Sequence, residues 1–87
     1  MKERSRLLKL CVNGLESKGL TGDVYKERLK REIKAIDEQA EHEYLLGLYD
    51  KFKSQRLIFP KNENNLFVDY LLGLTDEFDI NSDPVIV

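Results

Sequence analysis

The stretch YKERLKREIKAIDEQA, residues 25–40, has the clearest periodicity in the chain and decides its fold class. Its apolar side chains recur at the spacing of an α-helical turn. They are Tyr25, Leu29, Ile33, Ile36 and Ala40. Nearly all other positions are charged, and two pairs of opposite charge stand one turn apart, Glu27 with Arg31 and Arg28 with Glu32. We therefore predict a well-formed surface helix with these ion pairs on its solvent face.

The preceding segment predicts another amphipathic helix, from about Glu3 to Lys18. Its apolar side chains follow the same helical spacing, and they are Leu7, Leu8, Cys11 and Leu15. Gly19 then stands where a left-handed C-cap residue is common. Thr21-Gly22-Asp23 offers side-chain oxygens that can cap the next helix.

A third apolar stripe begins after Glu41-His42-Glu43 and consists of Leu45, Leu48, Tyr49 and Phe52. No Pro or Gly lies between Ala40 and Tyr44, so the second and third helical segments could form one continuous rod. Globular helices are usually shorter than such a rod, which favours a break between Gln39 and Glu43.

The last third of the chain is less regular. Leu57-Ile58-Phe59, stopped by Pro60, predicts an extended stretch or at most one short edge strand. Residues 61–65 form a polar loop, and a fourth helix then carries Leu66, Phe67, Tyr70, Leu71 and Leu74 on one face. The ending Val85-Ile86-Val87 is expected to dock as a short strand or to fray.

With 87 residues the chain can bury one hydrophobic core but not two. We expect a single helical domain over residues 1–87. Its fold class is mainly α, a small bundle of three to four helices with at most one short extended segment. No apolar run approaches the length that a membrane span needs, and the first six residues lead into an amphipathic segment rather than a secretory signal. We therefore expect a cytoplasmic protein without a membrane partner, with Cys11 packed in the core.

The residues for a complete catalytic or metal site are missing from the sequence. One cysteine and one histidine cannot supply the ligands of a zinc site. Asp79-x-Asn81-x-Asp83 imitates the start of a calcium loop, but Pro84 stands where that loop requires Gly. We interpret His42 as a surface histidine, because nothing near it completes a triad. The scattered glycines fit no phosphate-binding loop. The expectation is a protein that is not an enzyme and has no cofactor and no metal.

Charge is distributed unevenly along the chain. Residues 1–34 carry ten Lys and Arg against five Asp and Glu, whereas residues 35–87 carry four against eleven. The candidate contacts to nucleic acid or to a protein partner are Lys26, Arg28, Lys30, Arg31 and Lys34. Glu27 and Glu32 interrupt this basic surface, and the pI near 5.4 is low for a DNA-binding module. A salt-bridged solvent face is the preferred interpretation, and nucleic-acid contact is the alternative.

Four groups of residues, taken in order, resemble a known family. The first contains Leu7, Leu10-Cys11 and Gly14-Leu15; the second contains Tyr25, Arg28-Leu29, Glu32-Ile33 and Ile36. The third is Tyr44-Leu45-Leu46, with Asp50 and Phe52, and the last is Tyr70-Leu71-Leu72-Gly73-Leu74-Thr75-Asp76. Together they resemble the palm region of the alpha subunit of bacterial DNA polymerase III, the C-family replicative polymerase. The similarity covers about residues 7–80 and leaves residues 81–87 as a tail.

The chain departs from that family where the polymerase holds its nucleotide. The family carries a Gly- and Ser-rich loop around the triphosphate, and here residues 61–65, Lys-Asn-Glu-Asn-Asn, take a shortened version of its place. The family's metal-binding aspartates would fall beyond residue 87. The resemblance therefore implies a protein without polymerase activity.

We expect a noncatalytic DNA polymerase III alpha-like protein or fragment, of phage or other mobile-element origin, that binds a protein partner in DNA replication. Two alternatives stay open from the sequence. One is a small helix-turn-helix-like DNA-binding regulator that uses the second helical segment, residues 25–40. The other is a helical module that associates with its own copy through the apolar stripe of that segment.

Overall fold

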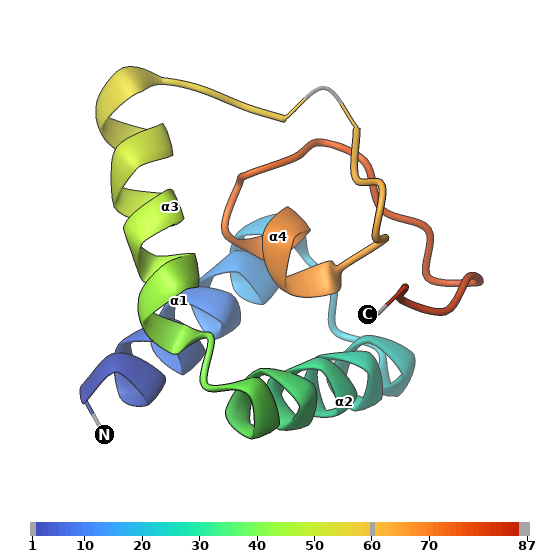
Figure 1. Cartoon of the computed structure of the whole chain (residues 1–87). Helices are drawn as coiled ribbons and strands as arrows, with labels where there is room; N and C mark the ends of the chain where they lie inside the picture. The colour runs from blue at the N-terminus through green and yellow to red at the C-terminus, as the bar shows by residue number, and fades with distance from the viewer. Residues whose placement is uncertain (1, 60, 86–87) are drawn as a thin grey trace.

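Three long helices and one short helix make up the fold of the described residues (Figure 1). In order they are α1 (Lys2–Lys18), α2 (Asp23–Gln39), α3 (His42–Gln55) and α4 (Phe67–Leu71). This computed structural model describes residues 2–59 and 61–85. Within those residues the only extended pairing is a single parallel bridge between Phe59 and Thr75. The prediction of a small, mainly α bundle with at most one short extended segment is confirmed.

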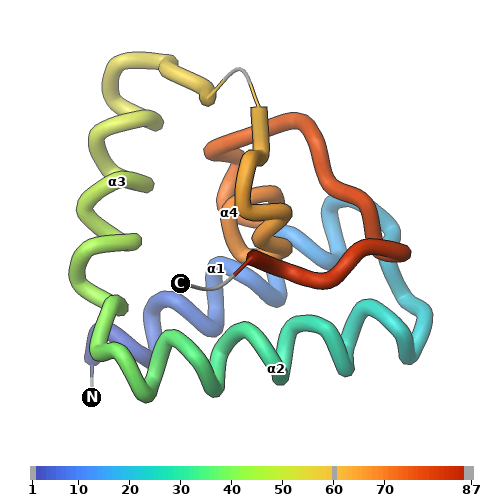
Figure 2. The backbone as a smooth tube through the Cα atoms, turned by 45° about the vertical axis from the view of Figure 1, so that its right-hand side comes forward, coloured from blue at the N-terminus to red at the C-terminus, as the bar shows by residue number. Residues whose placement is uncertain are grey.

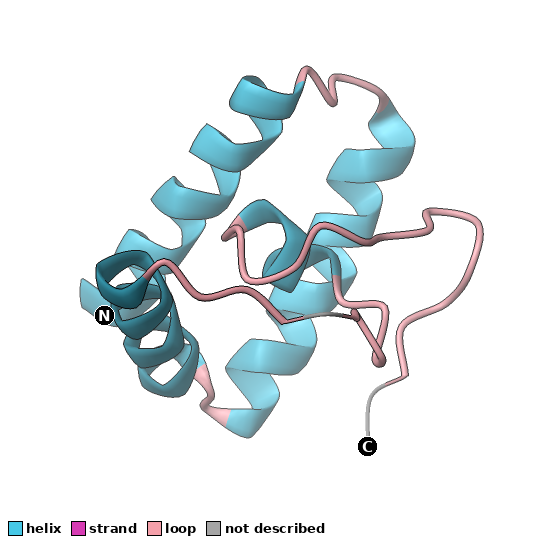
Figure 3. Cartoon of the chain, turned by 90° about the horizontal axis from the view of Figure 1, so that it is seen from above, coloured by secondary structure: helices cyan, strands magenta, loops and turns pink. Residues whose placement is uncertain are grey.

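The short helix α4 lies at the centre of the molecule. It packs against both α1 and α2, and α1 packs also against α3. Figure 2 shows the C-terminal segment passing close to α4 and α2, and Figure 3 shows α4 enclosed between the long helices. This arrangement places the described parts of the two irregular segments, residues 56–59 with 61–66 and residues 72–85, around α4. In the described part of the chain, no helix combines the length and the apolar character that crossing a membrane requires.

Backbone conformation, rather than side-chain hydrogen bonds, defines the end of α1 and the start of α2. Gly19 takes a left-handed conformation with φ of 67° after α1, as predicted. The predicted side-chain cap at the start of α2 is wrong, because Gly22 is the N-cap and no side chain caps it. Glycine is acceptable at an N-cap, and Asp23 becomes the first residue of the helix, where its negative charge favours the helix dipole.

α2 and α3 are separate helices, which confirms the favoured break between Gln39 and Glu43. Ala40 adopts a left-handed conformation with φ of 54°. Its cost, on the order of 1 kcal/mol for a residue with a Cβ, is offset by closure of the helix end, where Glu41 N donates to Ile36 O at 3.2 Å. The turn directs α3 away from α2, and His42 at the start of α3 becomes buried.

All four helices contribute to one hydrophobic core. Its buried members are Leu7, Cys11, Leu29, Ile33, Leu45, Leu46, Phe67, Val68, Leu71, Leu72 and Leu74. The predicted burial of Cys11 is confirmed, and burial raises the pKa of its thiol to about 12. A thiol with so high a pKa stays protonated and unreactive at neutral pH.

The helix α4 is shorter than the apolar face predicted for the fourth helix. The predicted fourth apolar face runs to Leu74, but the helix ends at Leu71, and Leu74 N closes the turn by donating to Asp69 O at 2.9 Å. Phe59 N donates to Leu74 O at 2.7 Å, and the segment makes one bridge, as expected for an extended stretch with at most one short edge strand. The predictions for Pro60 and for residues 86–87 concern positions outside the described residues.

Candidate functional site

α2 does not place its five predicted contact residues on one face. Lys26, Lys30, Arg31 and Lys34 are exposed, whereas Arg28 is only 4% exposed and points into the protein. The predicted solvent-face pair of Arg28 with Glu32 is therefore wrong, because both side chains are buried. Arg28 is not available to a phosphate group or to a partner surface.

The exposed face of α2 carries a balanced mixture of charges. Its basic residues are accompanied by Asp23, Glu27, Asp37 and Glu38, all of which are also exposed. Lys30 Nζ lies 3.6 Å from Glu27 Oε1, and Arg31 Nη2 lies 3.6 Å from Asp83 Oδ1. A face of alternating sign is typical of a solvated helix rather than of a phosphate-binding surface.

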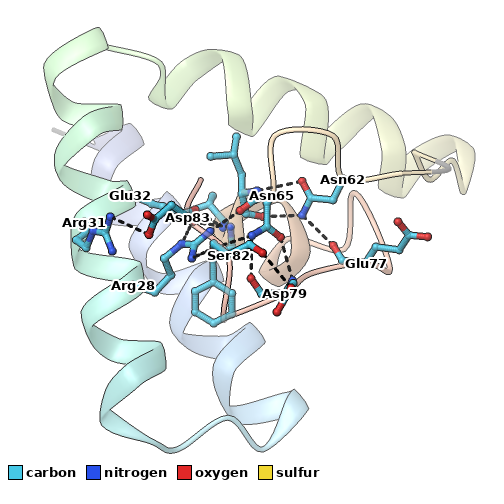
Figure 4. Close-up of polar contacts among 12 residues, drawn as sticks. Arg28, Arg31, Glu32, Asn62, Asn65, Glu77, Asp79, Ser82 and Asp83 are labelled. Atoms are coloured by element: carbon cyan, nitrogen blue, oxygen red, sulfur yellow. Dashed lines mark hydrogen bonds and ion pairs between the residues drawn. The ribbon is translucent and has the colours of Figure 1, made fainter. Parts of the chain in front are cut away.

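Arg28 links α2 to both irregular segments through one guanidinium group (Figure 4). Its Nε donates to Glu32 Oε2 at 2.7 Å. Its two terminal nitrogens donate to the carbonyl oxygens of Ser82, at 2.7 Å, and Asn65, at 2.6 Å. The guanidinium also lies 5.0 Å from the centre of the Phe78 ring, a favourable cation–π distance. The buried charge is thus satisfied by partners from three parts of the chain.

Glu32 completes this network at the beginning of α4. Its side chain is 1% exposed and accepts the backbone N–H groups of Phe67 at 2.7 Å and Val68 at 2.8 Å. The first N–H groups of a helix lack partners inside the helix, so a carboxylate from α2 supplies them here. Both oxygens of Glu32 are engaged, and its role is to fix the start of α4.

Two asparagines close the loop that precedes α4; we call residues 61–66 the asparagine loop. Asn62 Oδ1 accepts the N–H of Leu66 at 3.0 Å, while Asn62 Nδ2 donates to Glu77 O at 2.8 Å. Asn65 Oδ1 accepts the N–H of Asp79 at 2.9 Å, and Asn65 Nδ2 donates to Asp79 O at 2.8 Å. Figure 4 shows these amides directed at the chain's own backbone. The loop is therefore tied to residues 77–82.

The surface beside the asparagine loop is acidic. A depression there is lined by Asn62, Asn65, Asp76, Glu77, Phe78 and Asp79. Its charged lining residues are all carboxylates, and no cation lines it among the described residues. Asp79 is occupied locally, since its side-chain oxygens accept Asn81 N at 2.9 Å and Ser82 Oγ at 3.0 Å. The depression presents negative charge to any ligand that approaches the loop.

The single histidine takes part in a structural contact. His42 is 4% exposed, and its Nε2 lies 2.6 Å from Asp37 Oδ1. Arg4 Nε donates to the same carboxylate at 3.0 Å, and this hydrogen bond, followed by that of His42, lowers the pKa of Asp37. The prediction of a surface histidine is wrong because the turn at Ala40 carries His42 inward. The contact joins α1, α2 and α3.

A small cavity of about 170 Å³ between α2, α3 and α4 contains three acidic residues in its lining, Glu32, Glu41 and Asp69. Burial, followed by the negative charges of Glu32 and Glu41, raises the pKa of Asp69 to about 6. Across residues 2–59 and 61–85, no three His, Cys, Asp or Glu side chains are grouped in a way that could hold a metal ion. Protonation of Asp69 relieves the repulsion among the three carboxylates that line the cavity.

Asp69→Asn should stabilise the protein at neutral pH. The pKa of Asp69 is raised from 3.8 in the ordinary carboxyl group to about 6 in the folded state. Folding therefore takes up a proton in this window, and stability is lost as pH rises toward and through about 6. Asp69→Asn should add on the order of 1 kcal/mol at pH 7, because Asp69 is partly exposed and solvent weakens the effect. Urea denaturation at pH 5 and pH 7 measures both the gain and its pH dependence.

The matched control for this substitution is Asp76→Asn, at an exposed position outside the cavity. It should leave the pH dependence of unfolding unchanged. If Asp69→Asn changes neither the free energy of unfolding at pH 7 nor its pH dependence, the charged form of Asp69 is not disfavoured by its surroundings.

The polar network found here joins Arg28 and Glu32 to the asparagine loop, and its atoms are directed at one another. These hydrogen bonds hold the two irregular segments and α4 in place. The sequence analysis identified Arg28 but not its partners Asn65 and Ser82, nor the hydrogen bonds that Asn62 makes in the asparagine loop. This chain matches no protein-family model, no curated protein and no solved structure.

Proposed function

We propose that the chain is a noncatalytic relative of the palm region of the DNA polymerase III alpha subunit, and that it acts by binding a protein in DNA replication. The observation that carries this proposal is the asparagine loop. It stands where the resemblance puts the family's Gly- and Ser-rich loop, and its amides are hydrogen-bonded to the chain itself.

A nucleotide triphosphate needs features that this loop lacks. Its phosphates are usually held by free backbone N–H groups in a glycine-rich turn, often with a helix N-terminus. Here the N–H groups of Leu66, Phe67 and Val68 are already bound to Asn62 or Glu32. The acidic depression adjoining the loop would also repel the triphosphate. These contacts support a binding role without nucleotide chemistry.

The polymerase relationship has support from packing as well as from order along the chain. Its two least generic strings, residues 10–15 and 70–76, lie on α1 and at α4, which pack together. Gly14 lies so close to Leu71 that a Cβ at position 14 would be 2.5 Å from the Leu71 carbonyl oxygen. The most family-like residues therefore form one contact, as expected if they were retained together.

Both alternative functions have weaker support from the folded chain than from the sequence. A DNA-binding role for α2 rested on a basic surface from which Arg28 is now absent. Self-association through the apolar stripe of α2 rested on side chains that instead pack in or against the core, including Leu29 and Ile33. A protein partner must therefore be met by another surface.

The purified chain should show no saturable binding of a deoxynucleotide triphosphate in the presence of Mg²⁺. Equilibrium dialysis with labelled nucleotide measures this, and an intact polymerase III alpha subunit serves as the positive control. In the same preparation, immobilised chain should retain an identified replication protein from bacterial lysate. Tight Mg²⁺-dependent nucleotide binding would contradict the noncatalytic assignment. If none of the proteins retained from the lysate acts in replication or nucleic-acid processing, the proposed role in replication is contradicted.

A further inference from the structure

Three consecutive apolar residues are exposed directly after α3. Leu57, Ile58 and Phe59 have exposed fractions of 45%, 47% and 41%. Single exposed apolar residues are ordinary on protein surfaces, but a contiguous group commonly marks an interaction site. The group lies in the extended segment that leaves the end of α3 (Figure 1).

One side of this segment is fixed and the other is open. Phe59 N donates to Leu74 O at 2.7 Å, and the Phe59 ring packs on Phe52 with ring centres 4.7 Å apart. Backbone groups of successive residues in an extended chain point to opposite edges. The N–H and C=O of Ile58 should therefore face away from Leu74, and they form no hydrogen bond with another described residue. An extended peptide can pair with such an edge.

The residues on either side of the exposed group in sequence are basic, while Glu63 and Asp69 join Phe59 and Lys61 in lining a neighbouring depression. Residues 51–61 contain Lys51, Lys53, Arg56 and Lys61, and no Asp or Glu. All four side chains are exposed, and none forms an ion pair with another residue of the described part. The whole chain has a net charge of -2, so this local excess of positive charge stands out. It favours a negatively charged partner.

A groove adjoins the exposed segment at the end of α3. Its lining consists of Tyr49, Phe52, Lys53, Arg56, Leu57, Leu72 and Gly73. Apolar side chains thus lie next to two cations. A ligand that complements this groove carries apolar side chains together with carboxylates.

We propose that the surface formed by residues 57–59 and this groove binds an extended acidic and apolar peptide segment of a protein partner. The proposal rests on the protein-binding role proposed above and names the surface that performs it. An extended peptide uses all three features, because its backbone pairs with Ile58, its alternate side chains enter the groove, and its carboxylates meet the cations. Single-stranded nucleic acid would need open aromatic faces for stacking, but the Phe59 ring already packs on Phe52.

A labelled short peptide in which Asp alternates with Leu and Phe tests the surface directly. Fluorescence anisotropy should show saturable binding that weakens as salt is raised. The same peptide with Lys in place of Asp should not bind. No binding of the acidic peptide, or equal binding of both peptides, overturns the proposal. So does tighter binding of an oligothymidylate of the same charge, which would assign the surface to nucleic acid.

Ile58→Asp should lower the affinity for the acidic peptide about tenfold or more, because it removes an exposed apolar contact and adds a repelling charge. Val24→Asp is the matched control, since Val24 is also β-branched and is 56% exposed on α2. It should leave the affinity unchanged. Thermal unfolding of both variants checks that the fold is retained. Equal affinities for the two variants overturn the assignment of the surface.

The two proposals fail in different ways. If Ile58→Asp still retains the replication protein from lysate as well as the parent does, the surface is wrong and the proposed function stands. If the acidic peptide binds as expected but no replication protein is retained, the surface stands and the proposed setting is wrong.

Discussion

Arg28→Ala should lower the free energy of unfolding by about 3–5 kcal/mol, the usual cost of removing one partner from a buried ion pair. The substitution leaves Glu32 charged at 1% exposure, with only two backbone N–H groups as partners. It also removes the donors to the carbonyl oxygens of Ser82 and Asn65. A domain of this size has a total stability on the order of 5 kcal/mol. About 0–2 kcal/mol then remains, so circular dichroism should show up to about half of the molecules unfolded at room temperature, and unfolding should be complete at a much lower urea concentration than in the parent.

Arg31→Ala is the matched control for this loss. Arg31 lies on the same helix, but its ion pair with Asp83 spans 3.6 Å and is solvent-exposed. Such pairs contribute about 0–1 kcal/mol, so this variant should unfold close to the parent in urea. Comparable losses in the two variants would show that burial of Arg28 is energetically unimportant.

Replacing Arg28 and Glu32 together separates charge from packing. In the double substitution of Arg28 by Met and Glu32 by Leu, no unpaired charge is buried, so the loss should be smaller than for Arg28→Ala. Some loss should remain, because the N–H groups of Phe67 and Val68 no longer have the Glu32 carboxylate as acceptor. A double variant as unstable as Arg28→Ala would show that an unpaired buried charge on Glu32 is not the main cause of the loss.

The helices were predictable because their signals are local. The stripe over residues 25–40 repeats with the helical period, and Gly19 marks the end of α1 by a conformation that glycine adopts easily. The break at Ala40 was favoured only by helix length, since no Pro or Gly marks it. Residues that determine their own backbone conformation could therefore be assigned without knowledge of the fold.

The burial of Arg28 and Glu32 could not be predicted in the same way. Spacing alone describes them as an ordinary surface pair one turn apart. In helical projection, however, they lie on the same side as Leu29 and Ile33. Residues 62–85 bury them, and these residues contact α2 only because the two irregular segments fold back against it.

The asparagine loop illustrates the same limit. Its composition predicted a polar loop, which is correct, but not the partners of its side chains. Asn62 and Asn65 bind residues 77–82, and those contacts depend on how the chain after α4 turns back. Non-local hydrogen bonds of this kind leave no periodic signal in a single sequence.

Gly14→Ala should destabilise the protein by up to about 2 kcal/mol, even though alanine is the better helix former. Intrinsic propensity favours Ala over Gly inside a helix by about 1 kcal/mol. A Cβ at position 14 of α1, however, would lie 2.5 Å from the carbonyl oxygen of Leu71. That oxygen is backbone, so relief requires α4 to move away from α1, and overpacking of this kind usually costs about 1–3 kcal/mol. Urea denaturation followed by circular dichroism measures the net change.

Gly47→Ala should change the free energy of unfolding in the opposite direction, and it separates helix propensity from overpacking. Gly47 lies inside α3, and a Cβ there would meet nothing within 4 Å. Only helix propensity changes, so this variant should gain about 0.5–1 kcal/mol. Because the two substitutions are chemically identical, a gain at Gly47 with a loss at Gly14 isolates the close contact between α1 and α4. A gain at both positions would mean that α1 and α4 do not approach as closely as this contact requires, and the packing argument for the polymerase-like strings would fail with it.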